Sequence, residues 1–144
     1  MPVLIDTNIL LRTLQPANSH CAMAQRAIDI LRSRRETLWV CAQNIVEFWA
    51  VVTRPLQENG LGFSIGRALQ EVAAIKRHFP VLPETPLLPA WESLVSSHQV
   101  IGRSVHDARL VAAMIQHRLD SILTFNTQDF MRYPQIKILD PQTF

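Results

Sequence analysis

Four acidic residues are candidates for metal-dependent chemistry, because they are associated with helix starts, with one polar helix edge or with loops after predicted strands. Mg²⁺ and Mn²⁺ bind carboxylate oxygens, and four unneutralised carboxylates in one pocket would repel one another and raise each other's pKa. A bound divalent cation would remove that conflict, lower the pKa of a coordinated water and stabilise charge on a phosphate, which suits phosphodiester hydrolysis. The four candidates are Asp6, Glu47, Asp107 and Asp129.

Asp6 directly follows the apolar run Val3-Leu4-Ile5, so we expect it where a buried strand emerges from the core. A buried carboxylate without a partner is costly, which favours a place at the surface or beside a cation. The alternative is a helix cap or turn residue, but Asn8 already suits the capping role. Glu47 lies on the one narrow polar edge of a strongly apolar helix, so it is either an exposed residue or a carboxylate held at a pocket rim.

Asp107 opens the stretch VHDARLVAAMIQH, where an acid in the first helical turn is also favoured by the helix dipole alone. Asp129 lies in ILTFNTQDF, after a predicted strand and after Asn126. An Asx-turn followed by an ordinary loop would explain this second stretch equally well. Each local alternative stays open, but the four acids together favour a shared site.

The elements that must position these residues are short apolar strands separated by helices. This pattern predicts an α/β fold with a parallel sheet that has helices on both faces. In such sheets ligands bind beyond the carboxyl ends of the strands, where Asp6 and Asp129 are expected. The predicted strands are 2–6, 38–41, 81–82, 121–125 and 136–139.

Helical spacing of apolar residues, together with caps and prolines, indicates the segments between the strands. No repeat, low-complexity segment or linker divides the chain, so one domain over residues 1–144 is expected. The predicted helices are 9–14, 21–34, 43–52, 65–78, 90–97 and 105–119.

Composition narrows the function classes. With 48% hydrophobic residues the chain can bury a core, and a net charge of +2 gives no broad basic footprint of a nucleic-acid binder. Two cysteines suffice for neither a metal cage nor a disulfide framework. No apolar run reaches the roughly 18 residues of a membrane span, and no leader is visible, so we expect a soluble cytoplasmic protein.

The ordered set of motifs resembles the PIN-domain ribonucleases, and within them the VapC-type toxins of type II toxin–antitoxin pairs. The motifs are LIDTN at the start, the helix with Glu47, HDARLVAAM with Asp107, and LTFNTQDF near the end. The resemblance spans almost the whole chain. It implies a three-layer α/β/α domain with a mainly parallel sheet of about five strands, and a Mg²⁺- or Mn²⁺-dependent endoribonuclease acting on RNA.

The same resemblance implies roles for the acids. Asp6 and Asp107 would be the principal metal ligands, and Glu47 would be a further ligand or a base that orients water. Asp129 would be the fourth acidic member, acting directly or through water. Asn126 stands where some PIN domains have another acid, and this departure puts a tightly held second metal in doubt.

Supporting residues and partners follow from the resemblance as well. Thr7, Asn8 and Thr124 would orient the carboxylates by hydrogen bonds. Toxin-like members form homodimers and are silenced by a small antitoxin, which inserts a segment near the active site and often brings an arginine to the acidic pocket. The chain would have no membrane partner.

Other function classes fit the sequence less well. A non-catalytic RNA-binding or assembly domain with the same fold would be expected to lack one of the acids, and all four are present. A phosphatase of the haloacid type needs a second aspartate where Asn8 stands, and the signature residues of a receiver domain are not visible. No histidine pair has the spacing of a zinc site, and there is no glycine-rich phosphate loop.

Overall fold

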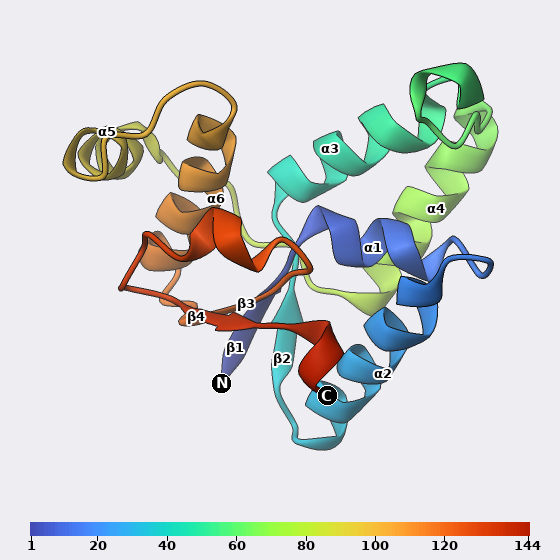
Figure 1. The fold of residues 1–144 in the computed structure, drawn as a ribbon, viewed down its shortest axis with the longest axis horizontal. Coiled ribbons are helices and arrows are strands. Elements are labelled where there is room, and N and C mark those ends of the chain that lie inside the picture. The colour runs from blue at the N-terminus through green and yellow to red at the C-terminus, as the bar shows by residue number, and fades with distance from the viewer.

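A parallel sheet of four short strands, in the order β2-β1-β3-β4, forms the centre of the computed structural model, which describes residues 1–144 (Figure 1). The central strand β1 pairs in parallel with β2 on one side and with β3 on the other, and β4 pairs with β3. All carboxyl ends of the strands therefore meet at one edge of the sheet. The strands are β1 (Pro2–Ile5), β2 (Thr37–Trp39), β3 (Ser121–Leu123) and β4 (Lys137–Leu139).

The predicted strand at 81–82 is reduced to a single bridge, so the sheet has four strands where about five were expected. Val81 pairs only with Val40, whose backbone N–H donates to the carbonyl of Pro80 and whose carbonyl accepts from the N–H of Leu82. Pro80 and Pro83 flank this segment and have no N–H to donate, so the hydrogen-bond ladder cannot continue on either side.

Six α-helices cover the sheet in two layers, which confirms the expected three-layer α/β/α architecture (Figure 1). Helices α1 to α4 contribute to one buried cluster, whereas α5 and α6 contribute to the other. None of the helices is long and apolar enough to cross a membrane. The helices are α1 (Thr7–Thr13), α2 (Ser19–Ser33), α3 (Ala42–Thr53), α4 (Ile65–His78), α5 (Leu88–Ser97) and α6 (Ser104–Gln116), with 3₁₀ turns η1 (Leu56–Glu58), η2 (Thr127–Phe130) and η3 (Pro141–Thr143).

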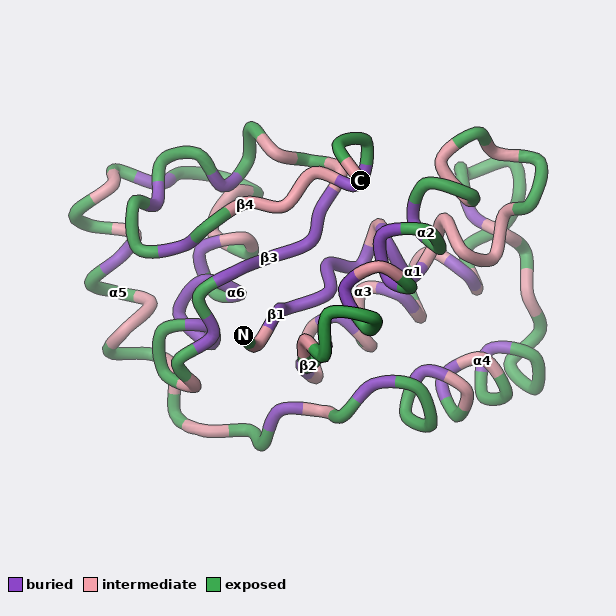
Figure 2. The backbone as a smooth tube through the Cα atoms, turned by 90° about the horizontal axis from the view of Figure 1, so that it is seen from below, coloured by how far each residue is buried: buried purple, intermediate pink, exposed green.

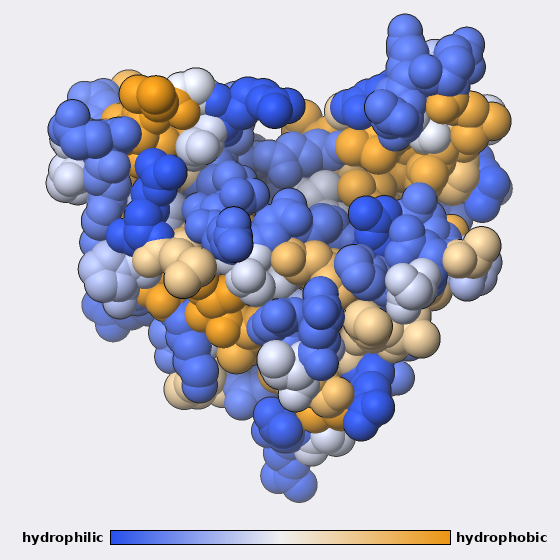
Figure 3. All heavy atoms as spheres, in the orientation of Figure 1, coloured by the Kyte–Doolittle hydropathy of each residue, from blue (hydrophilic) through white to orange (hydrophobic).

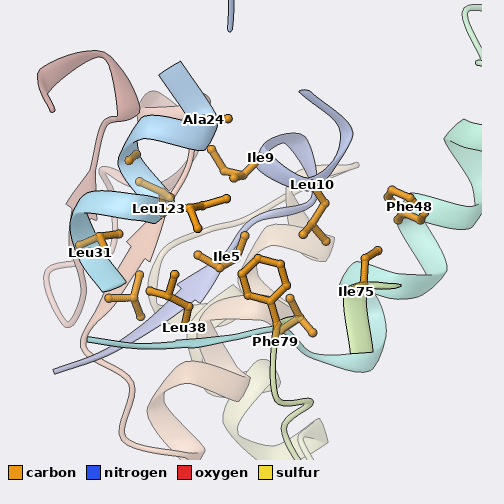
Figure 4. Close-up of a cluster of buried hydrophobic side chains, with 14 of the residues drawn as sticks. Ile5, Ile9, Leu10, Ala24, Leu31, Leu38, Phe48, Ile75, Phe79 and Leu123 are labelled. Atoms are coloured by element: carbon orange, nitrogen blue, oxygen red, sulfur yellow. The ribbon is translucent and has the colours of Figure 1, made fainter. Parts of the chain in front are cut away.

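The side chains of β1 alternate between the two buried clusters. Val3 and Ile5 pack with α1 to α4, and Leu4 packs on the opposite face with Ile122 and α6. Because both faces are covered, the central strands are mostly apolar and almost wholly buried (Figure 2). Figure 4 shows how Ile5 and its neighbours from the helices fill the larger cluster. This packing fixes the ends of β1 and β3, from which the polar residues of the site emerge.

Candidate active site

Asp6 links the end of β1 directly to the start of α1. Its Oδ1 accepts a hydrogen bond of 2.8 Å from the N–H of Thr7, so Asp6 is the N-cap of the helix. The prediction that Asn8 caps this helix is wrong, because the helix begins immediately after the strand and Asn8 already lies inside its first turn. Asp6 is 7% exposed, and its second oxygen faces a polar cluster.

That cluster ties the carboxyl ends of β1 and β3 together. The hydroxyl of Thr124, which is fully buried, donates to Oδ2 of Asp6 at 2.7 Å, and the Asn8 amide donates to the same oxygen at 3.2 Å. The Asn8 amide also donates to the Thr124 hydroxyl, which accepts from the N–H of Asn126 as well. In addition, the carbonyl oxygen of the Asn8 side chain accepts from the N–H of Phe125. One carboxylate is thus oriented by groups from both strand ends.

Glu47 extends from α3 toward the same cluster and is half-buried. Its Oε2 accepts from the Thr7 hydroxyl at 2.8 Å, and its Oε1 accepts from the Gln43 amide at 2.8 Å. The Thr7 hydroxyl accepts in turn from the amide of Asn44, a fully buried residue that also accepts from the N–H of Cys41. Glu47 is therefore held at both carboxylate oxygens. The sequence allowed either an exposed residue or a carboxylate held in place, and the structure has the second arrangement.

Asp107 lies in the first turn of α6 and is half-buried. Its pKa is raised from 3.8 to about 7, first by burial and then by the negative charges of Asp6, Asp129 and Glu47, while Arg132 acts in the opposite direction. A helix-dipole role alone would lower this pKa, so repulsion and burial dominate at this position.

The pKa of Asp6 is also raised, from 3.8 to about 6, chiefly by burial. Hydrogen bonds from Thr124 and Thr7 lower it, whereas the charges of Glu47 and Asp129 raise it. The negative charges of all four acids are therefore close enough to act on the pKa of Asp6 or Asp107, and the structure brings them into one neighbourhood.

Asp129 is the most loosely held of the four. It lies in η2, is exposed, and its N–H donates to the carbonyl of Asn126. The Asn126 side chain caps no backbone N–H, so the Asx-turn that the sequence allowed here is not formed. Asp129 reaches the site through its charge, which raises the pKa of both Asp6 and Asp107.

No basic side chain neutralises this acidic cluster by direct contact. The one ion pair of the chain joins the terminal amine of Met1 to Glu36, at the amino end of the sheet. Figure 3 shows a hollow with a hydrophilic floor between the lobe of α5 and α6 and the lobe of α3 and α4.

The donor set fits a hard divalent cation that keeps part of its water shell. It consists of carboxylate oxygens without sulfur or imidazole, which is the set that Mg²⁺ and Mn²⁺ prefer. No three acidic, histidine or cysteine side chains lie closely enough together to hold an ion by themselves. Mg²⁺ is commonly bound through one or two carboxylates and several waters, so two direct ligands with the other acids acting through water would suffice.

Two contributors were missed in the sequence analysis, Gln43 and Asn44. Both lie on the polar edge of α3 that carries Glu47, and Gln43 stands one helical turn before it, a spacing at which side chains meet. The spacing of Gln43 and Glu47 was a local signal in the sequence, whereas the bonds of Gln43 to α6 and of Asn44 to Thr7 join distant segments. Gln43 also contacts the carbonyl of His106 and the guanidinium of Arg109 in α6.

The chain is similar to known proteins both in sequence and in fold. A sequence model of the PIN domain matches residues 3–135. A chain of the Rickettsia felis VapBC2 structure, bound to a promoter DNA fragment, is similar with a TM-score of 0.72 and 12% identity, covering 97% of this chain and 98% of that one. A chain of a Klebsiella pneumoniae toxin–antitoxin complex has a TM-score of 0.65 and 19% identity, covering 96% and 97%.

A third similar structure is Mycobacterium tuberculosis VapC20, described as a toxin that cleaves the sarcin–ricin loop. It has a TM-score of 0.57 and 20% identity, covering 83% of this chain and 86% of that one. A search of curated proteins gives no significant match. At these identities the solved structures establish a shared fold, and the sequence model extends over nearly the whole chain.

Proposed function

The chain belongs to the PIN domain family, and from that premise we propose that it is a metal-dependent endoribonuclease that hydrolyses RNA phosphodiester bonds. The observation that carries the proposal is the gathering of Asp6, Glu47, Asp107 and Asp129 at one sheet edge without a basic partner in contact. Such an arrangement is costly for the fold unless a cation offsets the repulsion. Perturbed carboxylates of this kind are typical of functional sites.

In this proposal Asp6 and Asp107 would hold Mg²⁺ or Mn²⁺, and Asp129 would act through water. The chemistry that a bound divalent cation supplies at such a site is neutralisation of phosphate charge and a lower pKa for the attacking water. Glu47 has its orientation fixed by Thr7 and Gln43, yet each of its oxygens keeps a free lone pair to accept a proton from that water. Thr124 and Asn8 keep Asp6 turned toward the cluster.

A single principal ion is proposed, because Asn126 offers an amide where some PIN domains have a further acid. An amide brings no negative charge to offset a second dication. Asn126 is exposed and directly precedes η2, which contains Asp129. We therefore expect its amide to contact a backbone phosphate of the RNA substrate.

We also propose that the protein is the toxin of a type II toxin–antitoxin pair, acting on RNA in the cytoplasm as a homodimer. The support is that similar folds occur in a VapBC2 structure and in a toxin–antitoxin complex. An antitoxin could silence the site by bringing an arginine to the acidic cluster, since that cluster has no ion-paired arginine of its own.

The test is cleavage of total cellular RNA by the purified chain, followed by sequencing of the new 5′ ends. Cleavage should appear with Mg²⁺ or Mn²⁺, stop with a chelator, and be absent in the Asp6→Asn and Asp107→Asn variants. Full activity in both variants would contradict the mechanism. RNA binding without cleavage under every metal condition would favour the alternative, a non-catalytic RNA-binding or assembly domain with the PIN fold.

A further inference from the structure

The amide of Gln43 lies between an acidic and a basic side chain of the site. Its Nε2 donates to Oε1 of Glu47 at 2.8 Å and to the backbone carbonyl of His106 at 2.8 Å. Its Oε1 accepts from Nη1 of Arg109 at 2.9 Å. Both amide hydrogens and one oxygen lone pair of this half-buried glutamine are therefore engaged.

The partners also fix which way the amide points. A carboxylate and a carbonyl can only accept, and a guanidinium can only donate, so the opposite orientation of the amide would lose all three hydrogen bonds. Gln43 therefore has one stable orientation, in which a donor faces Glu47.

Gln43 connects the two helices that carry acids. It belongs to α3, as Glu47 does, and its bond to the carbonyl of His106 joins it to the residue directly before Asp107 in α6. The buried residues of α3 and α6 belong to different clusters, so this hydrogen bond is a direct polar link between the helices that carry Glu47 and Asp107. The amide bridges that gap at the rim of the site.

Arg109 approaches Glu47 but is kept one amide away from it. Its guanidinium is exposed and forms no ion pair with any acid of the chain. A direct arginine–carboxylate pair would neutralise Glu47 and occupy its lone pairs. The amide lies between the two side chains instead. The bond from Arg109 polarises the amide, which strengthens its N–H donation to Glu47, and Glu47 keeps its negative charge.

We propose that Gln43 is a positioning residue that fixes Glu47 relative to Asp107, and that Arg109 acts on the site through Gln43. This inference rests on the proposed function, because its consequence is a better-ordered site for a divalent cation. Through the carbonyl of His106, Gln43 also supports the first turn of α6, which carries the proposed ligand Asp107, and loss of a group that orients a metal ligand typically lowers metal affinity about 10- to 100-fold.

The first test compares Mn²⁺ affinity, measured by calorimetry, in the wild type and in the Gln43→Met variant. Methionine keeps the length of the side chain but neither donates to Glu47 nor accepts strongly from Arg109, so a 10- to 100-fold loss of affinity is expected, about the size seen when such supporting groups are removed. The Gln43→Glu variant keeps a partner for Arg109 but cannot donate when ionised, so it should not restore affinity.

A matched control exists in α2. Gln25 donates to Oδ1 of Asp29 at 3.0 Å, with the same four-residue spacing on an exposed helix face and no acidic cluster. The Gln25→Met variant removes the same type of hydrogen bond and should leave Mn²⁺ affinity unchanged. Equal losses in the Gln25 and Gln43 variants, or no loss in either while the wild type binds Mn²⁺, would overturn the inference.

A double-mutant cycle tests whether Arg109 acts on the site through Gln43. Arg109→Lys, which keeps the positive charge but lacks the guanidinium that donates to Gln43, should reduce Mn²⁺ affinity in the wild-type background and have no further effect in the Gln43→Met background. Additive losses would mean that Arg109 acts independently of Gln43 and would overturn that part. A wild type that neither binds Mn²⁺ nor cleaves RNA would instead contradict the proposed function, so the two failures are distinguishable.

Discussion

The hydroxyl of Thr124 lies 2.7 Å from Oδ2 of Asp6, although the two residues are 118 positions apart in the chain. The bond crosses from the end of β3 to the end of β1, the two strands at the centre of the sheet. It favours the ionised form of Asp6 and so opposes the effect of burial, which raises the pKa of that carboxyl. The charge state of the site thus depends on a contact that only the folded sheet can form.

Replacing Thr124 with Val should therefore weaken both the fold and the site. Oδ2 of Asp6 would lose a buried hydrogen bond and the N–H of Asn126 a partly buried one, so the free energy of unfolding should fall by about 1–3 kcal/mol. The pKa of Asp6 should rise further. Urea unfolding and carboxyl NMR titration measure the two effects. Thr37→Val, at an exposed strand position, is the control, and an equal response of both variants would refute this role of Thr124.

The Asp107→Asn variant should lose RNA cleavage and yet melt at a higher temperature than the metal-free wild type at pH 8. The folded chain holds the Asp107 proton more tightly than the unfolded chain, so the wild type's free energy of unfolding falls as the pH rises from about 4 to about 7. Asparagine carries no charge and escapes that loss.

Thermal unfolding at several pH values, without divalent cations, tests this prediction. The difference between the variant and the wild type should grow from pH 4 to pH 7 and stay constant above that. Asp120→Asn, an exposed acid at the amino end of β3, should show no such trend. A variant less stable than the wild type at pH 8 would show that Asp107 stabilises the metal-free fold, contrary to this account.

Mn²⁺ binding should be linked to proton release. The pKa values of about 6 for Asp6 and about 7 for Asp107 mean that protons and the cation compete for the same oxygens at mildly acidic pH. Affinity should rise between pH 5.5 and pH 7.5 by up to about tenfold per displaced proton and pH unit, then level off. Calorimetry in two buffers of different ionisation enthalpy counts the protons, and affinity independent of pH would argue against binding at these carboxylates.

Asn44→Leu should destabilise the start of α3. Asn44 is fully buried, and its removal leaves the N–H of Cys41 without an acceptor and the Thr7 hydroxyl without a donor. The expected cost is about 1–3 kcal/mol of the free energy of unfolding, measured by urea titration. The same amide-to-leucine change at the exposed Gln70 should cost far less, and equal costs would mean that the network around Asn44 contributes nothing.

The fold was largely predictable because its signals are local. The apolar runs before Asp6 and Asn126 and the helical stripes between them specify strands and helices within a few residues of the observed bounds. The short strand at 81–82 was overestimated, since two residues between prolines can form one bridge but no ladder.

The positions of the four acids, after strands and on a polar helix edge, could be read from the sequence, and their role in a metal site stays a prediction; their hydrogen-bond partners could not be read from it. Asp6 and Asn8 both suit an N-cap, and only the geometry of the chain decides between them. The bond from Thr7 to Glu47 spans 40 positions, and that from Arg109 to Gln43 spans 66. Contacts of this range depend on how helices pack across the sheet, which no local pattern encodes.

The most direct measurement is anomalous diffraction from crystals soaked with Mn²⁺. The account predicts a strong peak within bonding distance of the Asp6 and Asp107 carboxylates, with Glu47 and Asp129 close enough to act through coordinated water. A peak bound elsewhere on the chain, or no peak at this edge of the sheet at saturating Mn²⁺, would contradict a divalent-cation site made by these four acids.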